Sequence, residues 1–233
     1  MTTSQLLLDG DCDAVLFDLD GTLVDTAPDM VSVLQAMQAS RGLEPISYES
    51  ARRQVSNGAI GLLRAGFPEL GIEFGDSYHS EYLERYTSNV CIESRLFDGL
   101  ATLLDRLESA GRPWGIVTNK PEHLTNLLLD GLELAARSAC TVGGDSLPVR
   151  KPHPDPLLHA CDIAGVAAHR TVYIGDAARD IEAGLAAGMA TIAATYGYIT
   201  EDDDPASWGA DIMARDVEEL TQIVLKAVNL SCR

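Results

Sequence analysis

The sequence predicts an α/β protein in which a doubly wound parallel sheet carries an inserted small all-α cap. Two observations predict this fold. From residue 96 onward, short apolar segments alternate with helical patterns of roughly 10–15 residues, as is typical of parallel βαβ units. One apolar segment near the N-terminus is followed by residues 26–95, which contain helical patterns and no convincing strand. We therefore expect a catalytic core of residues 1–25 plus 96–233 and a helical cap of residues 26–95.

The individual elements follow from the spacing of apolar residues. VLFDLDGT (15–22) predicts a buried strand that ends in two aspartates. The apolar residues from Met30 to Met37 have the spacing of an amphipathic helix, and further helical patterns lie around residues 49–64 and 76–89. The remaining elements, in order, are a helix at 100–107, a strand at 114–118, a helix at 121–131, a strand at 140–143, a helix at 154–165, a strand at 171–175, a helix at 177–188, a strand at 190–195, a strand near 211–213 and a helix at 216–228. This alternation predicts a Rossmann-like sheet with helices on both faces.

Composition excludes several classes of partner. The formal net charge is −18, so nucleic acid and anionic membranes would repel the chain. No segment approaches the roughly 18 apolar residues of a membrane span. The cysteines have no C-x-x-C spacing, which favours reduced thiols and a cytoplasmic protein; they are Cys12, Cys91, Cys140, Cys161 and Cys232. We expect a small-molecule partner and a monomer or small homo-oligomer.

Asp18 and Asp20 stand at the carboxyl end of the first predicted strand, where open α/β sheets bind ligands. Two carboxylates this close repel each other unless a proton or cation intervenes, and Mg²⁺ prefers such oxygen ligands. A carboxylate is also a suitable nucleophile for a phosphate monoester, because a covalent intermediate divides a hard hydrolysis into two easier steps. The alternative is an acidic turn that only ends the strand.

Three later segments supply what such a pair needs. Thr118 and Asn119 follow a predicted strand and offer a hydroxyl and an amide to phosphoryl oxygens, although polar residues also end strands as turn formers. Lys151 offers a compact positive charge, although most lysines are surface residues. Asp176 is placed to complete a magnesium site, and Asp180 lies one helical turn further on. Its alternative role is to stabilise a helix N-terminus. All these segments are predicted at one edge of one sheet.

In this order and spacing, the motifs resemble the haloacid dehalogenase-like phosphatase superfamily with a small helical cap inserted after the first motif. The chain resembles its phosphoglycolate phosphatase-like branch and, more closely, the bacterial N-acetylmuramic acid 6-phosphate phosphatases of peptidoglycan recycling. The resemblance depends on these segments: FDLDGTLVDTAPD, VTNKP, the residues around Lys151, GDAARDIEAG, YGYI (196–199) and WGAD (208–211).

The resemblance implies a role for each core residue. Asp18 would be the nucleophile that forms an aspartyl phosphate, and it would also bind Mg²⁺. Asp20 would protonate the leaving oxygen, activate water and lend its backbone carbonyl to the metal. The remaining implied roles are phosphoryl binding by Thr118 with Asn119 nearby, contact with Asp18 and the phosphate by Lys151, Mg²⁺ ligation by Asp176, and orientation of the metal's water shell or of Lys151 by Asp180.

The cap is expected to choose the substrate. Ser56-Asn57-Gly58 is the expected cap loop over the catalytic edge. The candidate cations for a substrate carboxylate are Arg52, Arg53 and Arg64, whose alternative is simple exposure on helices. The five histidines lack ligand spacing and are expected at the surface, whereas the two tryptophans are expected to pack.

Two other functions use similar residues. A sugar phosphomutase of the same fold also needs two aspartates, but it returns the phosphoryl group to a bound intermediate. A phosphorylatable receiver-type switch combines an aspartate, a threonine and a lysine on a doubly wound sheet, but its single small domain leaves residues 26–95 unexplained. A dehalogenase is disfavoured because Asp20 would supply an acid/base group that its reaction does not need. The sequence therefore favours a Mg²⁺-dependent phosphomonoester hydrolase.

Overall fold

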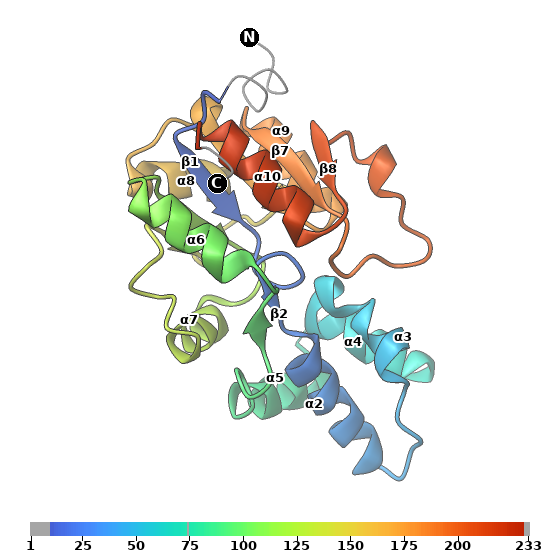
Figure 1. Ribbon diagram of the computed structural model, residues 1–233. Coiled ribbons are helices and arrows are strands. Elements are labelled where there is room, and N and C mark those ends of the chain that lie inside the picture. Colours follow the sequence, from blue (N-terminus) through green and yellow to red (C-terminus); the bar gives the residue numbers. More distant parts are fainter. Residues whose placement is uncertain (1–9, 74, 231–233) are drawn as a thin grey trace.

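The computed structural model describes residues 10–73 and 75–230, and its centre is one six-stranded parallel sheet (Figure 1). The strand order is β5-β4-β1-β6-β7-β8. The strands are β1 (Ala14–Phe17), β4 (Trp114–Val117), β5 (Thr141–Val142), β6 (Thr171–Gly175), β7 (Ala190–Ala194) and β8 (Ile212–Ala214). The predicted α/β fold with a parallel doubly wound sheet is confirmed.

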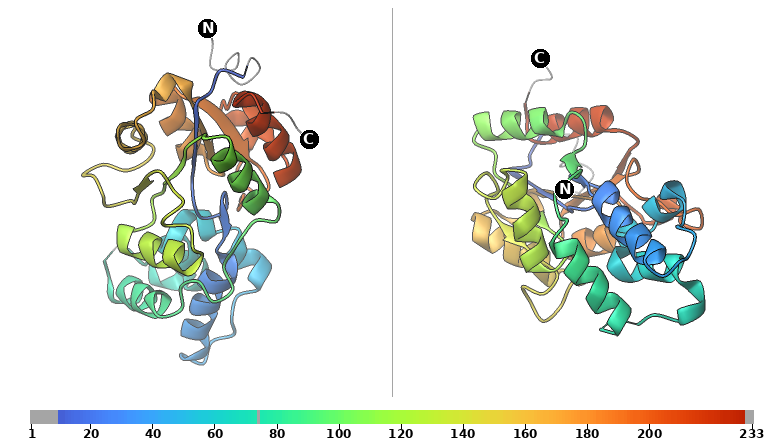
Figure 2. Two further views of the ribbon diagram at one scale, coloured as in Figure 1. Left: turned by 60° about the vertical axis from the view of Figure 1, so that its left-hand side comes forward. Right: turned by 90° about the horizontal axis from the view of Figure 1, so that it is seen from below.

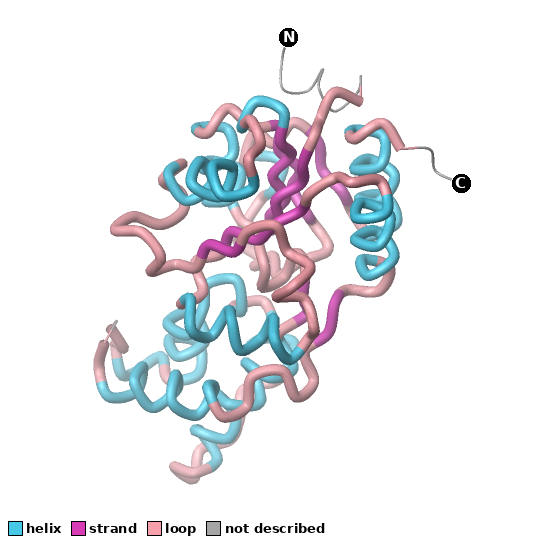
Figure 3. The backbone as a smooth tube through the Cα atoms, turned by 90° about the vertical axis from the view of Figure 1, so that its left-hand side faces the viewer, coloured by secondary structure: helices cyan, strands magenta, loops and turns pink. Residues whose placement is uncertain are grey.

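Helices cover both faces of the sheet because successive strand residues point to opposite sides. Val15 and Phe17 of β1 lie in one hydrophobic cluster, whereas Leu16 lies in another on the opposite face. Figures 1 and 3 show the strands enclosed between the two helical layers. The first face packs against α6 (Leu100–Ser109) and α10 (Val217–Ala227), and the second against α8 (Asp155–Ala164) and α9 (Ala178–Ala186). The further elements are α7 (Glu122–Gly131) and the short 3-10 helices η3 (Ala168–Arg170) and η4 (Pro205–Ser207).

The inserted segment, which we continue to call the cap, is helical (Figure 2). Its buried apolar side chains form a hydrophobic cluster. Its elements are α2 (Ala27–Ala39), α3 (Tyr48–Arg52), η1 (Val55–Asn57), α4 (Gly58–Gly66), η2 (Pro68–Leu70) and α5 (Ser77–Thr87). The pattern at 49–64 therefore does not form one continuous helix. The first helix ends at Arg52, and Gly58, with a φ of +66°, separates the short turn η1 from α4. The exact domain boundaries at 26 and 95 stay a prediction.

A two-stranded antiparallel ribbon joins the cap to the core. It consists of β2 (Val24–Asp25) and β3 (Arg95–Leu96), which were not predicted because both segments lie outside the alternation of apolar strands and helices. We call this ribbon the hinge. Asp29 of α2 supports it by accepting hydrogen bonds of 2.8–3.0 Å from the backbone N–H groups of residues 92–94. The first helix of the cap is thus tied to the returning chain.

The structure also tests what the sequence predicted for the histidines, the tryptophans and the cysteines. His79 was expected at the surface, but α5 buries it, and burial lowers the pKa of its imidazole. Trp114 packs in the core as expected. The described cysteines carry free thiols, while Cys232 and the N-terminal residues 1–9 lie outside the described residues. Across the described part of the chain, no helix combines the length and apolar character needed to cross a membrane.

Candidate active site

The predicted catalytic residues meet at the carboxyl ends of three neighbouring strands. Asp18 follows β1, Thr118 follows β4 and Asp176 follows β6, and these strands are adjacent in the sheet. Lys151 comes from the loop between β5 and α8, and Asp180 from the first turn of α9. All five side chains are buried. We call this region the carboxyl edge.

Lys151 lies at the centre of a buried ionic cluster. Its Nζ donates to Asp18 Oδ1 at 2.8 Å and lies 2.8 Å from Asp180 Oδ1. It also bonds the Val117 carbonyl at 2.9 Å and the Tyr173 hydroxyl at 2.8 Å. Burial by itself would lower the pKa of Lys151, but the two carboxylates outweigh burial and raise the pKa. The ammonium group therefore stays charged beside Asp18.

Three buried carboxylates are suited to hold a divalent cation. Asp18, Asp176 and Asp180 each offer an oxygen, and these oxygens lie within 4.8 Å of one another. Asp176 Oδ1 is buried and has no hydrogen-bond partner among the described residues. Burial, with Asp18 and Asp180 nearby, raises the pKa of Asp176 to about 7. A hard cation with oxygen ligands fits this donor set because it would relieve the repulsion and satisfy the free oxygen.

Glycines allow the backbone to approach these carboxylates closely. A Cβ atom at Gly21, which has a φ of +86°, would overlap Asp176 Oδ2. A Cβ atom at Gly197 would collide with the Asp176 side chain, and one at Gly175 with Asp180. The motif glycines therefore serve to pack the chain tightly around the acidic cluster.

Asp20 is directed to different partners from those of Asp18. Its Oδ1 accepts from Thr26 Oγ1 at 2.7 Å and from Lys120 Nζ at 3.1 Å. Lys120 is buried and also donates to the Tyr86 hydroxyl of the cap at 3.1 Å. The sequence analysis did not select Lys120, although its position directly after the Thr118-Asn119 segment was an available signal. The two aspartates of the first motif thus have separate environments.

Asn119 bonds the backbone of Lys151, and its predicted contact with phosphate stays a prediction. Its Nδ2 donates to the Lys151 carbonyl at 2.9 Å, and its Oδ1 accepts from the Lys151 N–H at 3.1 Å. The side-chain amide thus fixes the backbone of the loop that presents Lys151. Thr118 remains at the end of β4, where its Oγ1 accepts from the Lys120 N–H at 3.2 Å.

One predicted cap residue contacts the carboxyl edge directly. The Ser56 hydroxyl donates to Asp176 Oδ2 at 2.6 Å, and Arg179 of α9, which the sequence analysis missed, donates to the Ser56 carbonyl. The guanidinium of Arg52 lies over the Tyr198 ring, 4.7 Å from its centroid. The other predicted cap residues bond elsewhere or start a helix: Arg53 pairs with Glu201, Asn57 bonds Gln54, Arg64 bonds the Ile72 carbonyl and Glu73, and Gly58 begins α4.

Known proteins resemble this chain in both sequence and fold. The family model of haloacid dehalogenase-like hydrolases matches residues 12–188. Over 207 residues the chain is 48% identical to a phosphoglycolate phosphatase of Xanthomonas campestris pv. campestris (strain 8004), covering 89% of this chain and 94% of that protein. Over 221 residues it is 42% identical to an N-acetylmuramic acid 6-phosphate phosphatase of Pseudomonas aeruginosa, covering 92% and 96%. The crystal structure of a predicted phosphoglycolate phosphatase from Haemophilus somnus 129PT has a TM-score of 0.78 at 26% identity, covering 92% and 98%.

These matches extend over most of the chain and include both the sheet and the helical insertion. They confirm the resemblance that the motifs indicated and agree with the ionic cluster at the carboxyl edge. The chain is a phosphatase, and it belongs to the haloacid dehalogenase-like hydrolase family.

Proposed function

We propose that the protein is a Mg²⁺-dependent phosphomonoester hydrolase that works through an aspartyl phosphate on a small carboxylated metabolite. The observation that carries this proposal is the environment of Asp18. Its carboxylate is held by Lys151 within a buried acidic cluster, while the second aspartate, Asp20, is bonded separately to Lys120. This difference in environment supports attack by Asp18 and proton exchange by Asp20.

The chemistry divides into two half-reactions. Asp18 attacks phosphorus, and the bond from phosphorus to the ester oxygen breaks while Asp20 protonates that oxygen. Asp20 then accepts a proton from a water molecule that attacks the phosphorus of phospho-Asp18, so phosphate is released and both aspartates return to their starting forms. Lys151 neutralises charge on Asp18 and on the transferred group, and Thr118 donates a hydrogen bond to a phosphoryl oxygen.

The acidic cluster is the proposed magnesium site. Asp18, Asp176 and the backbone carbonyl of Asp20 would bind the ion, and Asp180 would orient its surroundings through Lys151. When bound, Mg²⁺ supplies positive charge to the phosphoryl oxygens and offsets the repulsion between phosphate and carboxylates. The free oxygen of Asp176 supports this assignment.

The substrate is proposed from the relatives together with the cap. The names of the relatives specify phosphoglycolate and N-acetylmuramic acid 6-phosphate, and both molecules carry a carboxylate. We propose that Arg52 and Ser56 contact such a substrate, with Arg53, Asn57 and Gly58 lining the same side. The free thiols of the described cysteines support a cytoplasmic location.

The substrate is tested by comparing kcat/KM for N-acetylmuramic acid 6-phosphate and 2-phosphoglycolate with Mg²⁺ on one preparation. We expect release of free phosphate, with a preference of at least tenfold for one of the two compounds. Preference for the sugar phosphate assigns the protein to peptidoglycan recycling, and preference for phosphoglycolate assigns it to repair of that metabolite. A product isomer in place of free phosphate would instead identify a mutase.

The raised pKa of Asp176 predicts how magnesium and pH act on stability. Its unfolded pKa is about 3.9 and its folded pKa about 7, so the folded state binds more protons between these values. The resulting stabilisation is complete below pH 4 and is lost as pH rises through 7. Because Mg²⁺ needs the deprotonated carboxylate, we expect it to raise the melting temperature more at pH 8 than at pH 5.5.

Thermal unfolding with and without MgCl₂ at both pH values measures this effect. Asp176→Asn is the matched variant, since it removes the titrating group while keeping nearly the same volume. The larger effect of Mg²⁺ at pH 8 should disappear in this variant. Equal shifts at the two pH values in the wild-type protein would contradict the prediction.

A further inference from the structure

Tyr198 belongs to the YGYI segment, which lies outside the catalytic motifs. It comes from the core, after β7, yet its buried ring is part of the hydrophobic cluster of the cap. Its ring centroid lies 6.4 Å from that of Phe97, which follows the hinge strand β3. A core residue is therefore built into the interior of the cap.

The polar atoms of Tyr198 join three parts of the molecule. The hydroxyl donates to Asp25 Oδ1 of the hinge at 2.6 Å and accepts from the N–H of Ala27, the first residue of α2, at 3.0 Å. Its backbone N–H donates to Asp176 Oδ2 at 2.8 Å. The same Asp176 oxygen accepts from Ser56 of the cap, and Arg52 of the cap lies over the ring of Tyr198. The hinge, the cap and the acidic cluster thus meet at one residue.

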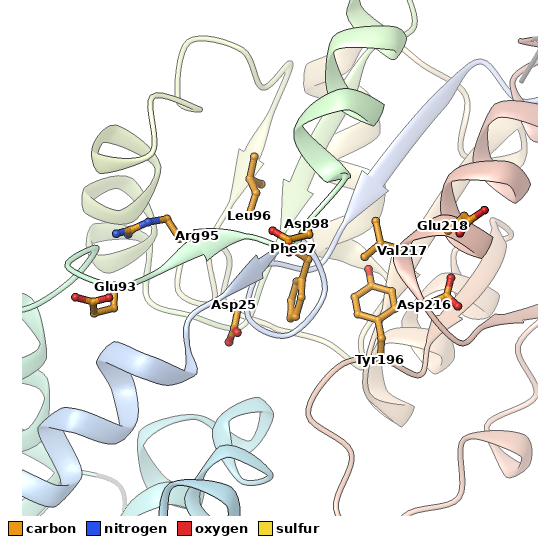
Figure 4. Close-up of a pocket in the computed structure, with 10 residues that line it drawn as sticks. All are labelled: Asp25, Glu93, Arg95, Leu96, Phe97, Asp98, Tyr196, Asp216, Val217 and Glu218. Carbon is orange, nitrogen blue, oxygen red and sulfur yellow. The ribbon is translucent and has the colours of Figure 1, made fainter. Parts of the chain in front are cut away.

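Tyr196, two residues earlier, bonds the core and packs on Phe97, the residue that follows the hinge. Its hydroxyl donates to the Thr22 carbonyl at 2.8 Å, and its ring meets Phe97 edge-on at 5.2 Å. Figure 4 shows Tyr196 and Asp25 on the wall of a pocket of about 560 Å³ beside the hinge. Five of the ten lining residues are acidic and Arg95 is the one cation, so this pocket is unsuited to a phosphorylated substrate. Tyr196 therefore serves as a matched control for Tyr198, because its hydroxyl bonds the core whereas the Tyr198 hydroxyl bonds the hinge and α2.

We propose that Tyr198 is a positioning residue that latches the cap over the carboxyl edge through its hydroxyl group. This inference rests on the proposed function, in which substrate binds between cap and core. Loss of the hydroxyl removes the shared partner of Asp25 and the Ala27 N–H, and the start of α2 then loses its hydrogen bond to Tyr198 of the core. The Ala27 N–H keeps a longer bond of 3.3 Å to Asp25 Oδ1 of the hinge. The latched arrangement is then less populated, and substrate affinity falls in proportion to that population.

The test compares Tyr198→Phe with Tyr196→Phe by steady-state kinetics and hydrogen exchange. In Tyr198→Phe, KM for the preferred phosphate monoester should rise roughly tenfold with kcat within about twofold, because saturating substrate restores the latched state. The amide of Ala27 should exchange at least tenfold faster without substrate. Tyr196→Phe should change neither KM nor the exchange of Ala27 by more than about twofold.

Three outcomes would overturn the latch: unchanged KM in Tyr198→Phe, a lower kcat at constant KM, or equal effects in both variants. If Tyr198→Phe does not fold, Asp25→Ala removes the same hydrogen bond from the other side and should give the same rise in KM. If the wild-type protein releases no phosphate from any monoester, the proposed function fails. In that case, the rate of hydrogen exchange at the Ala27 amide in Tyr198→Phe, compared with the wild-type protein, still decides whether Tyr198 holds the start of α2.

Discussion

Asp18→Asn is expected to lower kcat for phosphate monoesters by roughly four orders of magnitude or more while leaving the fold intact. The amide cannot attack phosphorus as a carboxylate does, so no aspartyl phosphate forms. The fold should survive because the amide oxygen can still accept from Lys151, which also keeps Asp180 as an ionic partner. Phosphate release and circular dichroism measure the two effects.

The matched control for this substitution is Asp13→Asn. Asp13 precedes β1 at the opposite end of the same strand and pairs with Arg170 and Arg112 at the surface. This variant makes the same chemical change away from the carboxyl edge, so kcat should stay within about twofold. Acid quenching during turnover should trap protein-bound phosphate in the wild-type protein and in Asp13→Asn only. Activity of Asp18→Asn within tenfold of the wild type would mean that another group attacks phosphorus.

Lys151→Met is expected to destabilise the protein by about 3–5 kcal/mol and to lower kcat/KM at least a hundredfold. Lys151 is buried and is the cation that contacts Asp18 and Asp180 directly. Methionine keeps most of the volume but removes the charge, so repulsion within the acidic cluster is no longer offset. Urea unfolding gives the change in the free energy of unfolding.

Two conditions separate this electrostatic effect from a packing defect. Protonation of the carboxylates and binding of Mg²⁺ both reduce the repulsion, so the stability loss should be smaller at pH 5 than at pH 8 and smaller with Mg²⁺. Lys226→Met changes an exposed lysine of α10 and should alter the free energy of unfolding by less than about 0.5 kcal/mol. A loss for Lys151→Met that is independent of both pH and Mg²⁺ would contradict the electrostatic explanation.

The strands and helices of the core could be predicted because the spacing of apolar residues that identifies them is a property of neighbouring residues. A buried parallel strand is a short apolar run, and an amphipathic helix repeats every few residues, so β1, β6 and the helices between strands could be read from nearby residues. The hinge strands β2 and β3 were missed because neither two-residue segment is an apolar run and neither belongs to the alternation of strands and helices that revealed the equally short β5. The break between α3 and α4 was missed because the helical pattern of the sequence continues through residues 53–57, where the backbone leaves the α-helix.

The candidate site was predictable where a residue lies at the end of a strand. Asp18, Thr118 and Asp176 were selected because the carboxyl ends of neighbouring parallel strands share one edge. Arg179 was missed because nothing in its sequence neighbourhood distinguishes it from a surface cation, whereas Lys120 was missed although it directly follows the Thr118-Asn119 segment. His79 was misplaced for a related reason, since its burial depends on how α5 packs within the cap.

The sequence by itself determined the fold class, the family and the set of carboxylates at the end of the first strand. These features depend on residues close together in the chain, whose spacing dictates local structure. Only the tertiary structure decided that Asn119 holds Lys151, that Ser56 reaches Asp176, and that Tyr198 connects Asp25 to the acidic cluster. These pairs are separated by 22 to 173 residues, and such contacts arise only when the packing of sheet and cap brings distant segments together.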